Sequence, residues 1–426
     1  MDETSIITLA DVQAAAERIG DRVRVSPFAE TVALSEITGT RLYLKLENRQ
    51  RTGSFKERGA CNYLQSLSEL ERARGVVTAS AGNHAQAVAL HASRLGIRAY
   101  IVMPETTPLV KIESTRRFGA EVELFGKNYD EAAERAAVLQ QQYNLEYVHP
   151  FDDPRVIAGQ GTLGLELLAQ CPELEAVVVP VGGGGLLAGV ACAIKETRPD
   201  VRVYGVESRD FPGMKRALES DTFPSLPPGK TIADGIAVRR VGRYTIPLVR
   251  KYVDDIVLVD EEEIAEAILL LLEKEKTVAE GAGAVGLAAL VHRHLNLEGQ
   301  RVAVILSGGN IDVSLMARII ERGLVKTGRR VRLFLTAPDV AGTLARLTSV
   351  VASCGANILE INHDRAFSEA ELGHSSIELV LETHGFEHIG FVQSRLAEAG
   401  YPTHAAALPS RLASALAQAS VSRSPH

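Results

Sequence analysis

The chain contains no tryptophan, only four cysteines and only 5% aromatic residues among its 426 positions. The cysteines are Cys61, Cys171, Cys192 and Cys354, and no two of them form a CxxC pair. This spacing argues against a zinc ribbon or a disulfide framework and favours a reducing compartment, so we expect a cytoplasmic protein.

Long apolar runs are also missing, and none reaches the length of a membrane span. The first residues are acidic rather than basic, so neither a signal peptide nor a membrane partner is predicted. The net charge of −7 argues against a broad nucleic-acid surface. The hydrophobic content of 46% and the charged content of 23% are ordinary for a globular chain long enough for two or three domains.

Short β-rich runs alternate with helix-like segments from about residue 40 to residue 310. The runs cover residues 42–46, 76–79, 99–103, 121–125, 176–181, 201–206 and 302–306. Such alternation predicts an α/β fold with a mostly parallel sheet and helices on both faces. Ligands bind beyond the carboxyl ends of the strands in such sheets, so functional residues are expected there.

The pattern changes near residue 326. Residues 326–406 read as strand, helix, strand, strand, helix and strand, a βαββαβ order of the size of one small domain. Residues 1–325 form the first predicted domain. The last stretch, 407–426, is rich in alanine and serine and is expected to be a frayed helix or a disordered tail.

Four consecutive glycines, Gly182 to Gly185, separate an apolar strand from the start of a helix at Leu186. Backbone N–H groups at such a junction can approach a phosphate closely, and a helix N-terminus favours an anion. Residues 183–188 also fit the dinucleotide fingerprint, with Glu207 placed for a ribose, whereas no Gly-Lys-Ser/Thr follows as in a nucleotide P-loop. The alternative is a tight turn without a ligand.

A second segment, Thr52 to Ala60, contains Lys56 beside Phe55. Ser54 and Glu57 have the spacing of a capping box, which predicts a helix start here. A lysine in the first turn of a helix can have a lowered pKa and act as an amine nucleophile. The alternative is a solvated lysine on a capped helix.

Two further polar segments follow predicted strands. In Ser80-Ala81-Gly82-Asn83-His84 the helix start could hold a substrate carboxylate, or Ser80 or Asn83 could simply cap the helix. The second is Ser307-Gly308-Gly309-Asn310, which could be only a turn. Because all these junctions follow strands of one predicted parallel sheet, we expect them to meet in one crevice.

Together the segments 54–60, 80–84, 182–185 and 307–310 match, in type and order, the pyridoxal-phosphate enzymes of the threonine dehydratase group. The chain resembles this family over about residues 5–325. The resemblance implies the two-lobed parallel-sheet fold called fold type II, and residues 326–406 resemble an ACT-type regulatory domain.

The resemblance also implies a role for each matching residue. Lys56 would hold pyridoxal 5'-phosphate as a Schiff base, the glycines would cradle the phosphate, Asn83 would bond the ring hydroxyl and Ser307 would face the pyridine nitrogen. The full cofactor-binding set is Phe55, Lys56, Asn83, Gly182, Gly183, Gly184, Gly185, Leu186, Glu280 and Ser307. The substrate carboxylate would bind at Ser80, Ala81, Gly82 and Asn83.

The activity implied by the resemblance is β-elimination from L-threonine to give 2-oxobutanoate and ammonia, with L-serine as a second substrate. Serine racemase and 3-hydroxyaspartate ammonia-lyase are alternatives within the family, although racemases tend to have a serine at the position of Ala81. An NAD-dependent oxidoreductase and a non-enzymatic amino-acid sensor are alternatives from other classes.

The remaining expectations concern partners and metals. The resemblance implies a homo-oligomer, an amino-acid substrate and an amino-acid effector at the C-terminal domain. Some relatives bind a divalent cation through a glutamate and a downstream aspartate. Glu207 matches the first ligand, but Gly213 stands near the second, so no metal is predicted.

Overall fold

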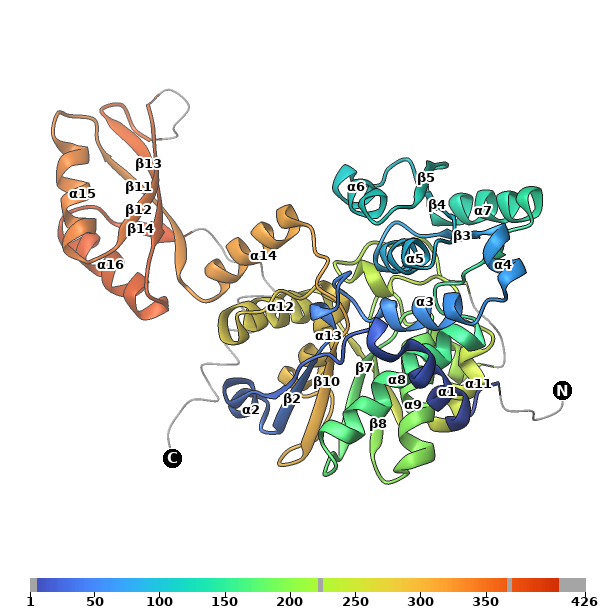
Figure 1. Cartoon of the computed structure of the whole chain (residues 1–426). Helices are drawn as coiled ribbons and strands as arrows, with labels where there is room; N and C mark the ends of the chain where they lie inside the picture. The colour runs from blue at the N-terminus through green and yellow to red at the C-terminus, as the bar shows by residue number, and fades with distance from the viewer. Residues whose placement is uncertain (1–5, 221–224, 366–369, 406–426) are drawn as a thin grey trace. The chain divides into compact units, whose positions relative to one another are not determined.

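The computed structural model describes residues 6–220, 225–365 and 370–405. The chain forms two compact units that divide between Val313 and Ser314. This division falls at the start of helix α14 (Val313–Lys326), whereas the sequence places the domain boundary at its end. The units are labelled in Figure 1 by their helices and strands.

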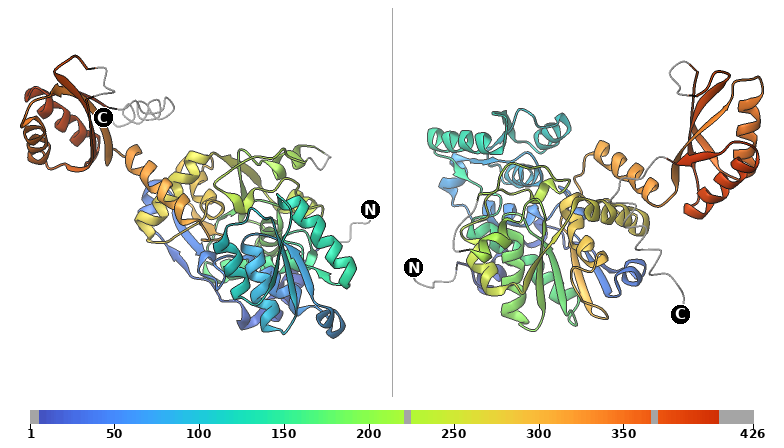
Figure 2. Two further views of the ribbon diagram at one scale, coloured as in Figure 1. Left: turned by 90° about the horizontal axis from the view of Figure 1, so that it is seen from above. Right: turned by 180° about the vertical axis from the view of Figure 1, so that it is seen from behind.

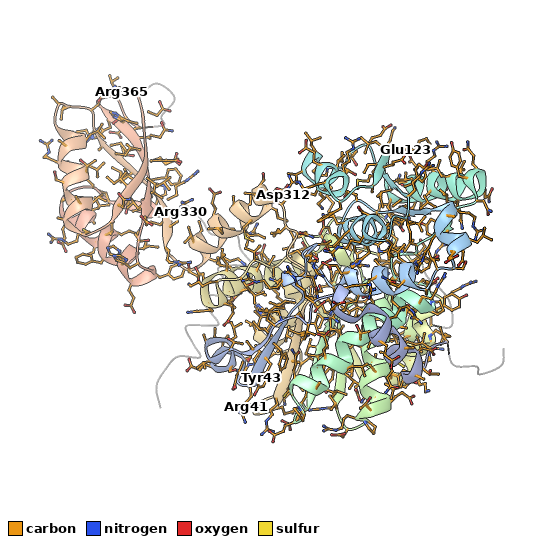
Figure 3. The ribbon with its side chains drawn as sticks, in the orientation of Figure 1. Arg41, Tyr43, Glu123, Asp312, Arg330 and Arg365 are labelled. Carbon is orange, nitrogen blue, oxygen red and sulfur yellow. The ribbon has the colours of Figure 1, made fainter. Side chains whose placement is uncertain are left out.

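The larger sheet of the first unit has the strand order β1-β2-β10-β7-β8-β9. The strands are β1 (Phe28–Glu30), β2 (Arg41–Leu46), β7 (Ala176–Pro180), β8 (Arg202–Ser208), β9 (Asp255–Val259) and β10 (Arg301–Leu306). Only β1 pairs antiparallel with its neighbour, where the ring of Phe28 stacks on that of Tyr43 with centroids 5.3 Å apart. Tyr43 is labelled in Figure 3. The other pairs are parallel, as the alternating pattern predicts.

Helices cover both faces of this sheet (Figures 1 and 2). Val177 and Val179 belong to a core that includes residues of α1, α8, α9 and α11, whereas a Cβ on Gly286 of α13 would contact Val178 on the opposite face at 3.4 Å. The helices of this lobe are α1 (Leu9–Ile19), α2 (Val32–Thr38), α8 (Pro154–Gln170), α9 (Gly185–Thr197), α10 (Gly213–Glu219), α11 (Thr245–Tyr252), α12 (Glu261–Glu275) and α13 (Gly281–Val291). Burial on both faces explains why β7 is apolar throughout rather than alternating.

The smaller lobe is built on a second parallel sheet, in the order β5-β4-β3-β6. Its elements are α3 (Lys56–Gln65), α4 (Glu69–Arg74), β3 (Val76–Ala79), α5 (Asn83–Arg94), β4 (Ala99–Met103), α6 (Leu109–Arg117), β5 (Glu121–Leu124), α7 (Tyr129–Tyr143) and β6 (Glu146–Tyr147). Residues of α3 and α5 pack on one face of the sheet and residues of α7 on the other (Figure 2). This lobe and the larger one form the first unit and correspond to the predicted two-lobed fold.

The second unit contains an antiparallel sheet in the order β12-β13-β11-β14. After α14 its elements are β11 (Arg330–Pro338), α15 (Thr343–Ser353), β12 (Asn357–Asp364), β13 (His374–Glu382), α16 (Phe386–Glu398) and β14 (Thr403–Ala405). This is the βαββαβ order that the sequence predicts. Arg365, labelled in Figure 3, pairs with Asp339 at 2.9 Å and ties the end of β12 to the end of β11.

The tail predicted over residues 407–426 lies outside the described residues. Among the helices that the structure describes, none combines the length and the hydrophobicity needed to span a bilayer.

Candidate active site

A cavity of about 1100 Å³ lies in the first unit, lined by residues from both lobes. Every residue that the resemblance assigns to the cofactor or to the substrate carboxylate lines it. They come from the start of α3, the start of α5, the glycine loop before α9, the start of α13 and the end of β10. The expected convergence of these junctions is therefore present, while the role of each residue stays a prediction.

Lys56 is the first residue of α3, directly after Phe55. Its Nζ donates a hydrogen bond to the carbonyl oxygen of Pro150 at 2.7 Å and lies 5.2 Å from the centroid of the Phe55 ring. Burial lowers the pKa of the Lys56 amine to about 8, and the nearby Glu280 carboxylate opposes this effect. An amine with such a pKa is deprotonated often enough near neutral pH to act as a nucleophile or a base.

The capping box predicted for α3 is wrong. The Ser54 hydroxyl is buried without a hydrogen-bond partner among the described residues, and the Glu57 carboxylate instead accepts from the backbone N–H of Thr52. Ser54 forms a β-bridge with Gly308, and Phe55 donates its backbone N–H to Ser307 at 3.0 Å. These tertiary pairings engage the backbone of Ser54 and Phe55, and the helix begins at Lys56 without a cap from Ser54.

The glycine loop has no room for side chains. A Cβ on Gly183 would lie 2.3 Å from the Phe151 ring, and one on Gly185 would lie 2.7 Å from the Phe151 carbonyl oxygen. Gly184 also has a φ of +94°, a left-handed conformation that favours glycine. The loop therefore brings bare backbone to the cavity at the N-terminus of α9, as anion binding requires.

The loop is held in place by Gly242 and by Thr245, the first residue of α11. The Thr245 hydroxyl donates to the Gly183 carbonyl oxygen at 2.8 Å, and the Gly242 N–H donates to the same oxygen at 3.1 Å. Because this carbonyl is engaged on the protein side, the loop has a defined conformation before any ligand binds.

The start of α5 is also uncapped. Its N-cap residue is Gly82, which has no side chain, while the Ser80 hydroxyl accepts from the Gly82 N–H at 3.3 Å. The Asn83 side chain bonds to Asn310 and Glu280 instead of to the helix. The alternative reading, in which Ser80 or Asn83 caps the helix, is therefore wrong, and the first-turn N–H groups are left for an anion.

Glu280, the N-cap residue of α13, accepts a hydrogen bond from Asn83 Nδ2 at 2.8 Å. Burial raises the pKa of the Glu280 carboxyl to about 7, and the nearby Asp234 raises it further. Ser307 is buried at the carboxyl end of β10, beside Glu280 and the bridge to Ser54. The neutral Ser307 hydroxyl and the readily protonated Glu280 carboxyl therefore line the same cavity.

The residues that follow β6 were not singled out from the sequence. Pro150 accepts from Lys56, and Phe151 lies under the glycine loop. His149 Nδ1 accepts from the Asp152 N–H at 2.7 Å, and burial lowers the pKa of His149 to about 4. These residues could have been found from the sequence, because aromatic residues and a proline lie directly after a short strand. Loops at strand ends often carry binding residues.

Glu207 does not line the cavity. It is buried at the end of β8, and its carboxylate accepts from the backbone N–H groups of Met214 and Lys215 at 2.7 and 2.9 Å. It therefore caps α10, which removes the ribose ligand required by the dinucleotide interpretation. Among the described residues, no group of three or more His, Cys, Asp or Glu side chains is arranged to hold a metal ion.

A lysine in a cavity, a glycine cradle for an anion and two uncapped helix starts at the edges of parallel sheets define an enzyme that holds a phosphate-bearing cofactor. Residues 19–308 match the family described as pyridoxal-phosphate dependent enzyme. The chain belongs to this family.

Two relatives match nearly the whole chain. The L-threonine ammonia-lyase of Thermotoga maritima is 50% identical over 396 residues, which is 93% of this chain and 98% of the relative. The L-threonine ammonia-lyase of Geobacter sulfurreducens is 48% identical and covers 92% of this chain and 97% of its own length.

Solved structures resemble a smaller share of the chain. Processed threonine deaminase isoform 2 from Solanum lycopersicum is 40% identical with a TM-score of 0.72, covering 75% of this chain and 89% of its own. Maize serine racemase is 33% identical with a TM-score of 0.71, and the match covers 75% of this chain and 98% of the racemase chain. The fold is therefore that of fold type II pyridoxal-phosphate enzymes, and the cofactor of the family is pyridoxal 5'-phosphate.

The cavity fits this cofactor on its own geometry. The glycine loop, in which an added Cβ would collide with neighbouring protein atoms, offers backbone N–H groups to the phosphate. Lys56 offers an amine for the aldehyde.

Proposed function

We propose that the protein is a threonine ammonia-lyase that converts L-threonine to 2-oxobutanoate and ammonia, with L-serine as a second substrate. The observation that carries the proposal is the convergence of Lys56, the glycine loop and the uncapped start of α5 on one cavity. The names of the two full-length relatives support the choice of threonine.

In this proposal Lys56, Phe55, Asn83, residues 182–186 and Ser307 hold the cofactor, with Glu280 beside it. When bound, pyridoxal 5'-phosphate stabilises the negative charge that develops at the substrate Cα. The neutral Ser307 hydroxyl at the end of β10 does not enforce protonation of a ring nitrogen, as a carboxylate would. The cofactor ring would then take up less of the negative charge from the substrate Cα, which favours loss of a leaving group from the substrate Cβ.

The chain's own groups then orient the substrate and move its proton. The first-turn N–H groups of α5 bind the substrate carboxylate, because a helix N-terminus favours an anion. The substrate amine would displace Lys56 from the cofactor, and the freed Lys56 amine, with its pKa lowered to about 8, would accept the proton from Cα. The hydrogen bond that Lys56 Nζ donates to the Pro150 carbonyl oxygen holds the amine at the cavity wall rather than in bulk water.

Threonine and serine differ by one methyl group, which a pocket discriminates by only about 1–3 kcal/mol. Activity on both is therefore expected. Serine racemase remains the second candidate because maize serine racemase shares the fold at 33% identity. Against it, Ala81 at the cavity has no proton to donate from the opposite face.

The test is release of 2-oxo acid and ammonia by the purified holoenzyme from threonine, serine and 3-hydroxyaspartate, with the chirality of recovered serine measured alongside. Lys56→Ala is expected to remove both turnover and the visible band of the bound cofactor. The matched control is Lys274→Ala, an exposed lysine on α12, which should leave both unchanged. Full activity in the Lys56 variant would refute the proposal.

Residues 326–406 are proposed to be an ACT-like regulatory domain that binds an amino-acid effector. The support is the βαββαβ order, with α15 and α16 packed on one face of the sheet through Leu347, Val351 and Val392. Kinetics with and without branched-chain amino acids test this proposal, and an unchanged response after removal of residues 326–426 would contradict it.

We further propose a homo-oligomer in the cytoplasm. The four cysteines are free and buried, which suits a reducing compartment. Light scattering of the purified protein measures the assembly, and a monomeric mass at assay concentration would refute it.

A further inference from the structure

Asn310 closes the segment that follows β10, and it lines the cavity beside Asn83. No role for Asn310 is predicted from the sequence. Its side chain is half-buried and packs tightly, since a Cβ on Gly53 would lie 2.7 Å from Asn310 Oδ1. Gly53 has a φ of +74°, so both the space and the backbone at this point require glycine.

The Asn310 amide nitrogen uses both of its N–H groups within the protein. Nδ2 donates to the carbonyl oxygen of Thr52 at 2.7 Å and to Asn83 Oδ1 at 2.6 Å. A backbone carbonyl can only accept, so Thr52 fixes which end of the Asn310 amide faces inward. Asn310 therefore presents a donor, and never an acceptor, to Asn83.

Asn83 in turn has one N–H group to spare. Its Oδ1 is taken by Asn310, and one of the two N–H groups on Nδ2 is donated to Glu280 Oε1 at 2.8 Å. The other N–H is the one available to the cofactor ring hydroxyl, the role that the family resemblance implies for Asn83. A rotated Asn83 amide would place two NH₂ groups against each other at Asn310.

Glu280 alone cannot set this orientation. Burial raises the pKa of Glu280 to about 7, so near neutral pH its carboxyl is protonated part of the time and can either donate or accept. Either end of the Asn83 amide could then face it. The contact that tolerates only one orientation is the one with Asn310.

We infer that Asn310 is a positioning residue that holds the Asn83 amide with one N–H group directed to the cofactor. The inference rests on the proposed role of Asn83. It predicts that Asn310 affects cofactor binding only through Asn83, which separates it from a residue that merely stabilises the loop.

The test uses purified protein stripped of cofactor and titrated with pyridoxal 5'-phosphate, together with the visible spectrum of each reloaded variant. Asn310→Ala should weaken binding about tenfold, because the hydrogen bonds to Thr52 and Asn83 are both lost and Asn83 is freed to rotate. Asn310→Asp, which has the same shape but presents oxygens to Thr52 and Asn83, should weaken it more. Both variants should shift the absorption maximum of the bound cofactor in the same direction as Asn83→Ala shifts it. Asn357→Asp, a surface asparagine paired with Glu382 in the second unit, is the matched control and should change neither.

A double-variant cycle decides the outcome. In the Asn83→Ala background, Asn310→Ala should have less than a twofold further effect on affinity. An equal loss in both backgrounds, or an absorption maximum unchanged by Asn310→Ala, overturns the inference while leaving the proposed function intact. If Asn83→Ala itself binds the cofactor normally, the proposed role of Asn83 fails and the inference fails with it.

Discussion

Gly183→Ala is the sharpest test of the glycine cradle. The added Cβ would lie 2.3 to 2.4 Å from three carbons of the Phe151 ring, well inside van der Waals contact. Because the Gly183 carbonyl is fixed by Thr245, the ring or the loop must move. Overpacking of this kind costs about 1–3 kcal/mol. If the cost falls on the binding conformation of the loop, affinity for pyridoxal 5'-phosphate drops about 5-fold to 150-fold.

The assay is titration of the cofactor-stripped protein, with a thermal unfolding curve for each variant. Gly390→Ala in α16 is the control, because a Cβ there meets nothing within 4 Å, so no loss of affinity is expected. Phe151→Ala provides the second control. In that background the space is open, and Gly183→Ala should cost much less than in the native protein. Native affinity in Gly183→Ala alone would refute the reasoning.

Two further predictions concern stability. Arg58→Ala leaves the buried Glu47 carboxylate without the guanidinium that contacts it at 2.8 Å, so urea unfolding should show a loss of about 3–5 kcal/mol. Arg198→Ala, at a more exposed pair, should lower stability much less, because solvent screens that pair, and equal losses would contradict the argument. Burial raises the pKa of Glu207 to about 7 from an ordinary 4.5, so the native state keeps a proton that the unfolded state has lost, and stability falls as pH rises through this window. Glu207→Gln should therefore flatten the decline of the unfolding midpoint between pH 5 and 7, and an unchanged slope would contradict this.

Much of the first unit could be predicted from the sequence, for a physical reason. Strands such as β7 and β10 are buried on both faces, so they read as continuous apolar runs bounded by turn residues. Parallel strands bring their carboxyl ends to one edge, which explains why the segments after β2, β7 and β10 meet. The segment after β3 belongs to the second sheet, and the sequence pattern did not reveal that the two sheets share one cavity.

Local patterns failed where tertiary contacts override them. Ser54 and Glu57 have the spacing of a capping box, but Ser54 forms a bridge with Gly308 and Glu57 accepts from the Thr52 N–H instead. Glu207 has the spacing of a ribose ligand, but it caps α10. The orientation of Asn83 depends on partners far away in the sequence, which no single-sequence pattern reveals.

Two helix starts without side-chain caps have a consequence for handling the protein. Both α5 and α9 begin with glycine at the N-cap, so each carries a partial positive end that any small oxyanion can neutralise. Sulfate or inorganic phosphate in a purification buffer would then compete with cofactor and substrate. We expect reconstitution to proceed best in chloride salts.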